Sequence, residues 1–208
     1  MQFEKAKRYI LKRLGNELAP DLYYHGLHHT LDVTDAVLRL SKLEKVSKEQ
    51  TVLLKTAALY HDAGFIKKYF MNEEIAAKMA KESLPYFGYT SKQIKTISEI
   101  IMATRISAEP KNHLEEIIRD ADLDYLGRED FYMIANTLKK ELYEYGLKYT
   151  GEQWKKILVN FLGNHVYYTK SARKLRELKK QKYLAQIKKL DSFAEQTMEK
   201  FQKKSTSR

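Results

Sequence analysis

Apolar residues recur every three or four positions along almost the whole chain, which is the period of a helix packed on one face. Only 8 Gly and 3 Pro interrupt the 208 residues, and no segment alternates apolar and polar residues between hairpin turns. Asn72 is the predicted N-cap of its helix, and Ser47 with Gln50 forms a predicted capping box. The apolar stripes predict helices over residues 3–18, 31–40, 47–60, 72–84, 90–101, 114–123, 129–145 and 152–162. We therefore expect an all-α chain.

The positive charges divide this chain into two parts. Net charge is +11, but residues 170–208 hold 13 Lys and Arg against 4 acidic residues, so this segment carries +9 and residues 1–169 only +2. We expect residues 1–169 to form one helical domain and residues 170–208 a long basic, amphipathic C-terminal helix. Its apolar stripe would pack on the domain or on a second copy of the chain in a homodimer. Because a basic helix is most often a solvated face, nucleic acid is disfavoured as a partner.

Composition excludes several classes of protein. The chain has no Cys, which rules out zinc–thiolate sites, thiol catalysis and a disulfide scaffold. No run approaches the roughly 18 apolar residues of a membrane helix, and the first 15 residues mix Lys and Arg with apolar residues. We therefore expect a cytoplasmic protein that does not span a membrane.

Histidines and aspartates gather in three short segments. The segment YHGLHHT, residues 24–30, contains three histidines, a His-Asp pair follows at residues 61–62, and RDADLD places three aspartates at residues 120–124. Charged groups beside an apolar face are costly unless they are paired or bind a metal ion. The neighbouring apolar residues would bring these helices together, so the set supplies two imidazoles and two carboxylates to one point.

In this order the motifs resemble the signature of the HD-domain superfamily of metal-dependent phosphohydrolases, which is His, then His-Asp, then Asp. The resemblance spans residues 24–127 and implies a helical bundle of the HD-domain and phosphodiesterase type. It implies four metal ligands, which are His29, His61, Asp62 and Asp122. His25, His28 and His29 compete for the first position. YHGLHHTLDV is similar to a stretch of the cyclic-nucleotide phosphodiesterases, and this similarity assigns His29 to the metal and His25 to proton transfer.

A set of imidazoles and carboxylates without a thiolate suits one divalent ion such as Mn²⁺, Fe²⁺, Co²⁺, Ni²⁺ or Mg²⁺. Such an ion makes a bound water acidic enough to supply hydroxide near neutral pH, and it offsets charge on phosphate oxygens. His25, at the rim, would protonate the leaving alkoxide. The expected function is hydrolysis of a phosphomonoester or phosphodiester of a small, nucleotide-like substrate.

Some features depart from the family pattern. Residues 100–105 contain no His, which disfavours a second metal ion, and no Glu closely follows the His-Asp pair to orient water. Glu73 is the predicted substitute. Asp120 is predicted to assist the water, to orient a ligand imidazole, or simply to lie at the end of its helix. Arg105 is either a phosphate-binding residue or a surface Arg, and His165 either lines the substrate pocket or packs in the core.

The sequence leaves two other functions open. The missing Glu suits a non-catalytic module that senses a nucleotide in the same pocket. The basic C-terminal helix suits nucleic-acid binding, which a salt-sensitive affinity would reveal.

Overall fold

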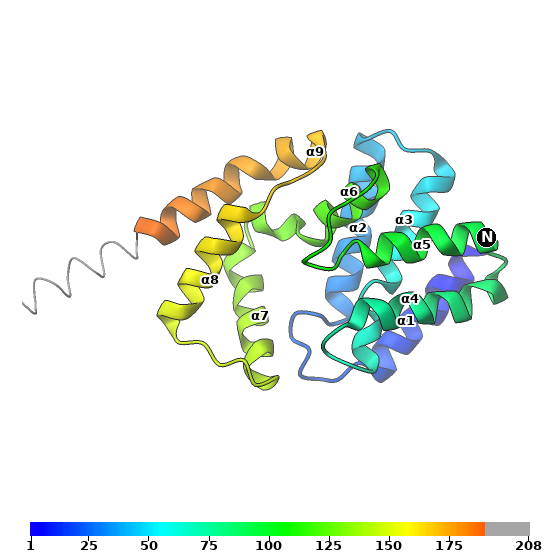
Figure 1. Ribbon diagram of the computed structural model, residues 1–208, viewed down its shortest axis with the longest axis horizontal. Helices are drawn as coiled ribbons and strands as arrows, with labels where there is room; N and C mark the ends of the chain where they lie inside the picture. Colours follow the sequence, from blue (N-terminus) through cyan, green and yellow to red (C-terminus); the bar gives the residue numbers. More distant parts are fainter. Residues whose placement is uncertain (190–208) are drawn as a thin grey trace, which may run out of the picture.

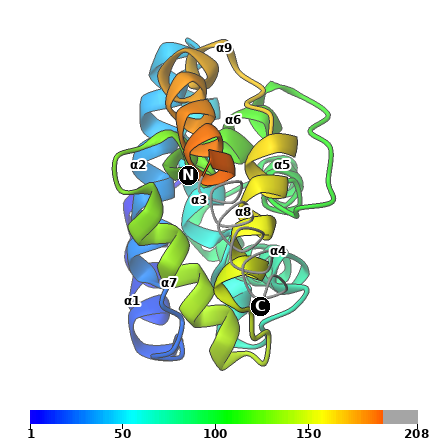
Figure 2. The ribbon, with the colours of Figure 1, turned by 90° about the vertical axis from the view of Figure 1, so that its left-hand side faces the viewer.

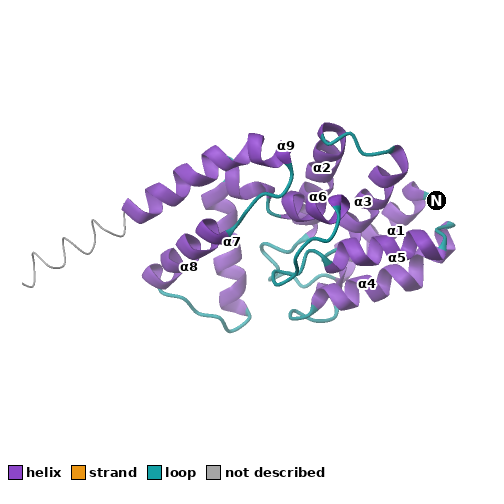
Figure 3. Cartoon of the chain, turned by 45° about the horizontal axis from the view of Figure 1, so that its top comes forward, coloured by secondary structure: helices purple, strands orange, loops and turns teal. Residues whose placement is uncertain are grey.

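The structure is a computed structural model, and it describes residues 1–189. Within this part every regular element is helical and no strand occurs, as predicted. Helices α1 to α6 form the larger body in Figure 1, and α7 to α9 lie along one side of it (Figures 1 and 3). The helices are α1 (Phe3–Glu17), α2 (Leu27–Leu43), α3 (Lys48–Tyr60), α4 (Asn72–Ser83), α5 (Ser91–Met102), α6 (His113–Asp122), α7 (Phe131–Glu144), α8 (Gly151–Asn164) and α9 (Lys170–Ala172). Short 3-10 helices cover Ala63–Ile66, Leu84–Phe87 and Asp124–Gly127. None of the described helices is long and apolar enough to cross a membrane.

The core lies where α2, α3, α5 and α6 meet. α2 packs against both α3 and α6, and α3 also packs against α5, which α4 covers from outside. Val37, Leu54, Ile97 and Ile117 come from these four helices and are fully buried. Burial of each such side chain contributes roughly 1.5–3 kcal/mol, so this packing fixes the ends of α2, α3 and α6 relative to one another.

Helix ends follow the sequence at some positions and depart from it at others, such as the start of α4. The predicted capping box of Ser47 and Gln50 is present. Asn72 is instead the first residue of α4, and the cap position is Met71, which has a φ of 59°. The reason is close packing beside the His-Asp pair, because a Cβ on Gly64 would lie 1.9 Å from the backbone oxygen of Asn72. The Asn72 side chain is buried, with Nδ2 3.4 Å from Asp62 Oδ1.

The described part of the basic C-terminal segment packs on its own chain. After α9 the helix passes through a π-turn at Arg173–Glu177 and continues to residue 189 (Figure 2). Arg176 donates two hydrogen bonds to the buried Asp124, at 2.8 and 2.9 Å. Tyr183 stacks on Phe131 of α7 with ring centroids 4.9 Å apart. Residues 190–208, the rest of the predicted helix, lie outside the described residues, and the two-part division and the homodimer stay predictions.

Candidate functional site

The ends of three helices bring the predicted metal ligands together. His29 lies in the first turn of α2, His61 and Asp62 directly follow α3, and Asp122 is the last residue of α6. Because α2 packs against both other helices, residues 93 positions apart in sequence become neighbours. The two histidines and Asp62 are buried, and the side chain of Asp122 is 18% exposed.

Imidazole nitrogens and carboxylate oxygens face one another in this cluster. His29 Nε2 lies 3.1 Å from Asp122 Oδ1, and His61 Nε2 lies 3.1 Å from Asp62 Oδ2. The two Nε2 atoms are 3.4 Å apart. One ligand atom from each of His29, His61 and Asp122 falls within 4.8 Å of the other two. A single ion could contact all of them.

The hydrogen bonds around the cluster are those expected of a site that binds a cation. His61 Nδ1 lies 2.8 Å from the carbonyl oxygen of Ala58, which only accepts, so Nδ1 carries a proton and Nε2 of the neutral ring keeps its lone pair. Asp62 Oδ2 is buried and accepts no hydrogen bond in the described part of the chain. Burial lowers the pKa of His61, but Asp62 and Asp122 outweigh it and raise that pKa well above its usual value. The carboxylates therefore attract positive charge to this point.

His25 is held beside the cluster by a residue that the motifs did not include. Glu141 of α7 is fully buried, and one of its oxygens contacts His25 Nδ1 and accepts from the Tyr69 hydroxyl at 3.0 Å. Its other oxygen accepts the backbone N–H groups of Tyr24 and His25 at 2.7 and 2.9 Å. The His25 ring stacks on Phe65, with centroids 4.3 Å apart. These contacts fix the imidazole and leave Nε2 as its available nitrogen.

Burial lowers the pKa of His25, but the hydrogen bond to Glu141 and the charges of Asp62 and Asp122 raise it more. The net effect is a pKa above the usual value for histidine. Such a group keeps its proton nearer to neutral pH, as a general acid requires.

Glu73 and Arg105 lie at the start of α4 and just after α5. The Arg105 guanidinium donates to Glu74 Oε1 at 2.9 Å, and its side chain is 34% exposed. This hydrogen bond raises the pKa of Arg105, and the charge of Glu73 adds to the effect. Both predicted residues thus belong to a group of charges at the N-terminal end of α4. The neighbouring residue Asn72 contacts Asp62, which links this group to the cluster.

Asp120 lies in the last turn of α6, the helix-end position that was one of the predictions for it. It is fully buried and accepts the backbone N–H groups of Tyr168 and Thr169 at 2.8 and 2.7 Å, together with the Thr169 hydroxyl at 2.7 Å. Residues two apart on a helix are separated by roughly 200° around its axis, so Asp120 and Asp122 face different ways. Burial raises the pKa of Asp120 to about 6. It holds the segment that leads into α9 rather than a ligand imidazole.

A cavity of about 700 Å³ adjoins the cluster, and Asp122 is part of its wall. His165 lines it, as one of the two sequence interpretations placed it, together with Phe161 of α8. Arg119, one turn before Asp122 on α6, also lines it. The Arg119 guanidinium donates to the backbone oxygens of residues 103 and 105 at 2.8 and 2.7 Å, and its buried Nε has no partner in the described residues.

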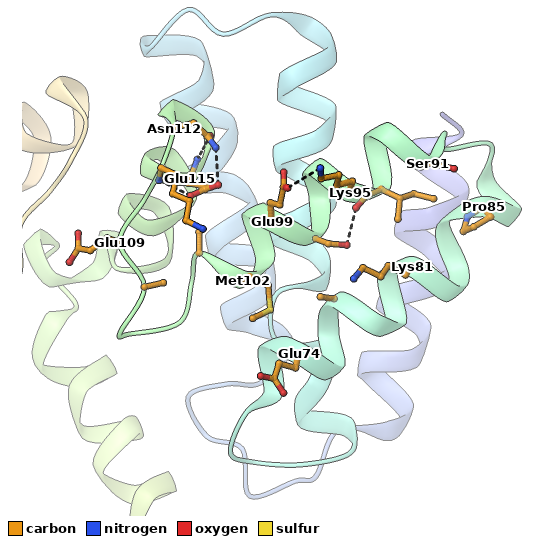
Figure 4. Close-up of a pocket in the computed structure, with 16 residues that line it drawn as sticks. Glu74, Lys81, Pro85, Ser91, Lys95, Glu99, Met102, Glu109, Asn112 and Glu115 are labelled. Atoms are coloured by element: carbon orange, nitrogen blue, oxygen red, sulfur yellow. Dashed lines mark hydrogen bonds and ion pairs between the residues drawn. The ribbon is translucent and has the colours of Figure 1, made fainter.

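A second cavity of about 1000 Å³ lies between α4, α5 and the segment that precedes α6 (Figure 4). Charged residues on its walls include Lys81, Lys95 and Glu115. None of the four predicted metal ligands lines it, and Glu109 is the residue that it shares with the cavity beside Asp122. The smaller cavity is therefore the one that adjoins the candidate chemistry.

The sequence motifs missed Glu141 and Arg119. Glu141 falls on the apolar stripe of α7 with Ile134 and Leu138, at helical spacing, and a carboxylate on such a stripe is the signal that could have identified it. Arg119 precedes the Asp-Ala-Asp run by one position, and nothing in the sequence distinguishes it from a surface Arg.

In the described residues, a helical bundle brings two imidazoles and a carboxylate together at its helix ends, an arrangement that could hold a metal ion. Residues 26–124 match the HD domain family, so this part of the chain is an HD domain, which confirms the resemblance. Among solved structures, YpgQ of Bacillus subtilis in complex with ADP is similar, with a TM-score of 0.66 and 18% sequence identity over 92% of this chain and 96% of that chain. This likeness confirms the fold. None of the curated proteins compared with the chain matches it.

Proposed function

We propose that the chain is a metal-dependent phosphohydrolase that cleaves a phosphomonoester or phosphodiester of a small, nucleotide-like molecule. The observation that carries this proposal is the convergence of His29, His61 and Asp122 at one point, beside Asp62 Oδ2, which accepts no hydrogen bond from the described residues. A buried carboxylate oxygen with no donor is costly unless a cation lies next to it. The ADP in the YpgQ complex supports a nucleotide as ligand.

Four residues would hold one divalent ion, namely His29, His61, Asp62 and Asp122. An ion with this mixed nitrogen and oxygen set, such as Mn²⁺, Fe²⁺, Co²⁺, Ni²⁺ or Mg²⁺, would supply positive charge for the phosphoryl oxygens and would lower the pKa of water. Arg119 lines the same cavity as Asp122 and suits a second contact to phosphate, because its planar fork matches phosphate oxygens.

His25 is the proposed proton donor to the leaving group. Its Nδ1 is engaged by Glu141, so the transferred proton must sit on Nε2. The perpendicular packing of its ring on that of His29, with centroids 5.9 Å apart, keeps it next to the metal ligands. Glu73 is the proposed group for orienting the attacking water, since it follows Asn72, which contacts Asp62. Arg105 would bind phosphate only after leaving Glu74.

The test compares metal content and turnover in His29→Ala, Asp62→Ala and the control His28→Ala, which changes the exposed histidine next to the ligand. Purified proteins are assayed on nucleotides and chromogenic phosphates with Mn²⁺, Co²⁺ or Mg²⁺. We expect the first two variants to lose both bound metal and turnover, and His28→Ala to keep both. Equal activity in metal-stripped protein would contradict the proposal. If nucleotides raise the thermal stability of the protein but no product forms with any of these ions, the chain is a nucleotide sensor and not a hydrolase.

A further inference from the structure

The cavity beside Asp122 has two unusually exposed aliphatic residues on its walls. Ile106, between α5 and α6, is 82% exposed, and Val166, between α8 and α9, is 60% exposed. Their chain segments are far apart in sequence, yet both line the same cavity as a predicted metal ligand. Two exposed aliphatic side chains, from two separate segments that line one cavity, indicate a ligand with an apolar surface.

His165 adds a polar group of fixed orientation to the same wall. Lys180 is 1% exposed, and its ammonium group donates to the backbone oxygen of His165 at 2.5 Å and pairs with Glu177 at 3.1 Å. The same Nζ lies 3.4 Å from His165 Nδ1. An ammonium group can only donate, so Nδ1 accepts and the proton of the neutral ring is on Nε2. His165 therefore offers a hydrogen-bond donor at Nε2.

We propose that this cavity binds the heteroaromatic base of a nucleotide, with Ile106 and Val166 against the apolar faces of the base and the Nε2–H group of His165 donating to an acceptor on its edge. This assignment rests on the proposed function, because Asp122 at the cavity wall would place the phosphate of that nucleotide at the metal cluster. It assigns base recognition partly to Ile106, between α5 and α6, and partly to His165 and Val166, which follow α8 and lie outside residues 26–124.

The chemistry of the walls favours a base over other phosphorylated molecules. A sugar phosphate without a base has no flat apolar surface for Ile106 and Val166 to cover, and a lipid tail has no acceptor for the His165 donor. Asn160 and Asn164 also line the cavity and can both donate and accept hydrogen bonds at the edge of a base. A volume of about 700 Å³ is sufficient for a ligand of this size.

The test measures calorimetric binding of adenosine, guanosine, cytidine, uridine and ribose to the full chain, wild type and two variants, Ile106→Ser and Val166→Ser. Both changes are at exposed positions, so the fold should persist. We expect at least one nucleoside to bind, ribose not to bind, and each variant to weaken the nucleoside by about fivefold to tenfold through lost apolar contact. The matched control, Leu178→Ser, changes an aliphatic residue that is 72% exposed and lies outside the cavity, and it should bind like wild type.

In active protein the same two variants should raise KM for the cognate nucleotide by a similar factor, and Leu178→Ser should not. Binding of no nucleoside at millimolar concentration, or equal binding by wild type and both cavity variants, would overturn the base site. Nucleosides carry no phosphate, so this result is independent of hydrolysis. If the protein hydrolyses none of the substrates but binds a nucleoside through Ile106 and Val166, the hydrolase proposal is wrong and the base site stands.

Discussion

The buried carboxylate of Glu141 should control proton transfer by His25, and Glu141→Gln tests this with little change in shape. The two oxygens of Glu141 serve four donors, which are the backbone N–H groups of Tyr24 and His25, His25 Nδ1 and the Tyr69 hydroxyl. Glutamine keeps one oxygen, so two of these donors must lose their acceptor. If that oxygen continues to accept from the backbone N–H groups of Tyr24 and His25, the new side-chain N–H₂ group faces His25 Nδ1. His25 Nδ1 must then accept a hydrogen bond instead of donating one. The neutral tautomer follows, because the hydrogen bond and the charge of Glu141 no longer raise the pKa of His25 and only Asp62 and Asp122 still do.

Two magnitudes follow from this loss. General acid catalysis contributes about 10²–10⁴ in rate, so turnover of an alkyl phosphate, whose leaving group needs a proton, should fall at least about 100-fold. Hydrogen bonds to a charged group contribute about 1.5–3 kcal/mol each, so we expect unfolding free energy to drop by about 3 kcal/mol. Turnover of p-nitrophenyl phosphate should fall by less than about tenfold, because its leaving group departs readily as an anion.

The assay is the ratio of the two turnover rates at saturating substrate, together with thermal unfolding to confirm that the variant is folded at the assay temperature. Tyr69→Phe is the matched control, since it removes one donor to Glu141 and leaves the contact with His25 intact. That control should change neither rate by more than a few fold. An equal loss on both phosphates in Glu141→Gln would refute the reasoning and leave Glu141 with a structural role alone.

The remaining predictions concern stability. Burial and the charge of Lys180 lower the pKa of His165 from 6.5 to about 4, so the unfolded chain binds more protons between these pH values and stability should fall as pH drops through this window, by about 3 kcal/mol in total. Denaturant titrations should show a flatter pH dependence in His165→Gln, and an unchanged slope would contradict the assignment. Gly64→Ala and Gly127→Ala place a Cβ 1.9 and 2.3 Å from backbone oxygens, so each should lower unfolding free energy by about 3 kcal/mol or more. Gly163 has open space around it, so Gly163→Ala should leave the unfolding free energy unchanged or raise it. Equal losses of unfolding free energy in all three glycine variants would show that the close approaches at Gly64 and Gly127 do not affect stability.

The helices and the convergence of the predicted metal ligands followed from the sequence because both depend on local patterns. Apolar spacing determines where a helix begins and which face is buried, and the order of His, His-Asp and Asp falls at helix ends that the packing of α2 brings together. The cap of α4 was not predictable in this way. It depends on the contact of Gly64 with the backbone of Asn72, and a contact between two helices leaves no signal in either segment alone.

Contacts between distant segments also explain why the partners of Asp120 and the position of Glu141 were not predicted. Helical geometry alone separates Asp120 from Asp122, so a stricter use of the period would have directed Asp120 away from the cluster. Its actual partners, Tyr168 and Thr169, are 48 and 49 positions away and belong to a turn that the sequence does not predict. Glu141 contacts a residue 116 positions earlier, and its carboxylate meets its four donors only because α7 lies against the segments that precede α2 and α4. The motif residues thus supply the proposed ion site, whereas Glu141, which would position the acid, and His165 and Val166, which would recognise the substrate, come from α7 and from the segment that follows α8.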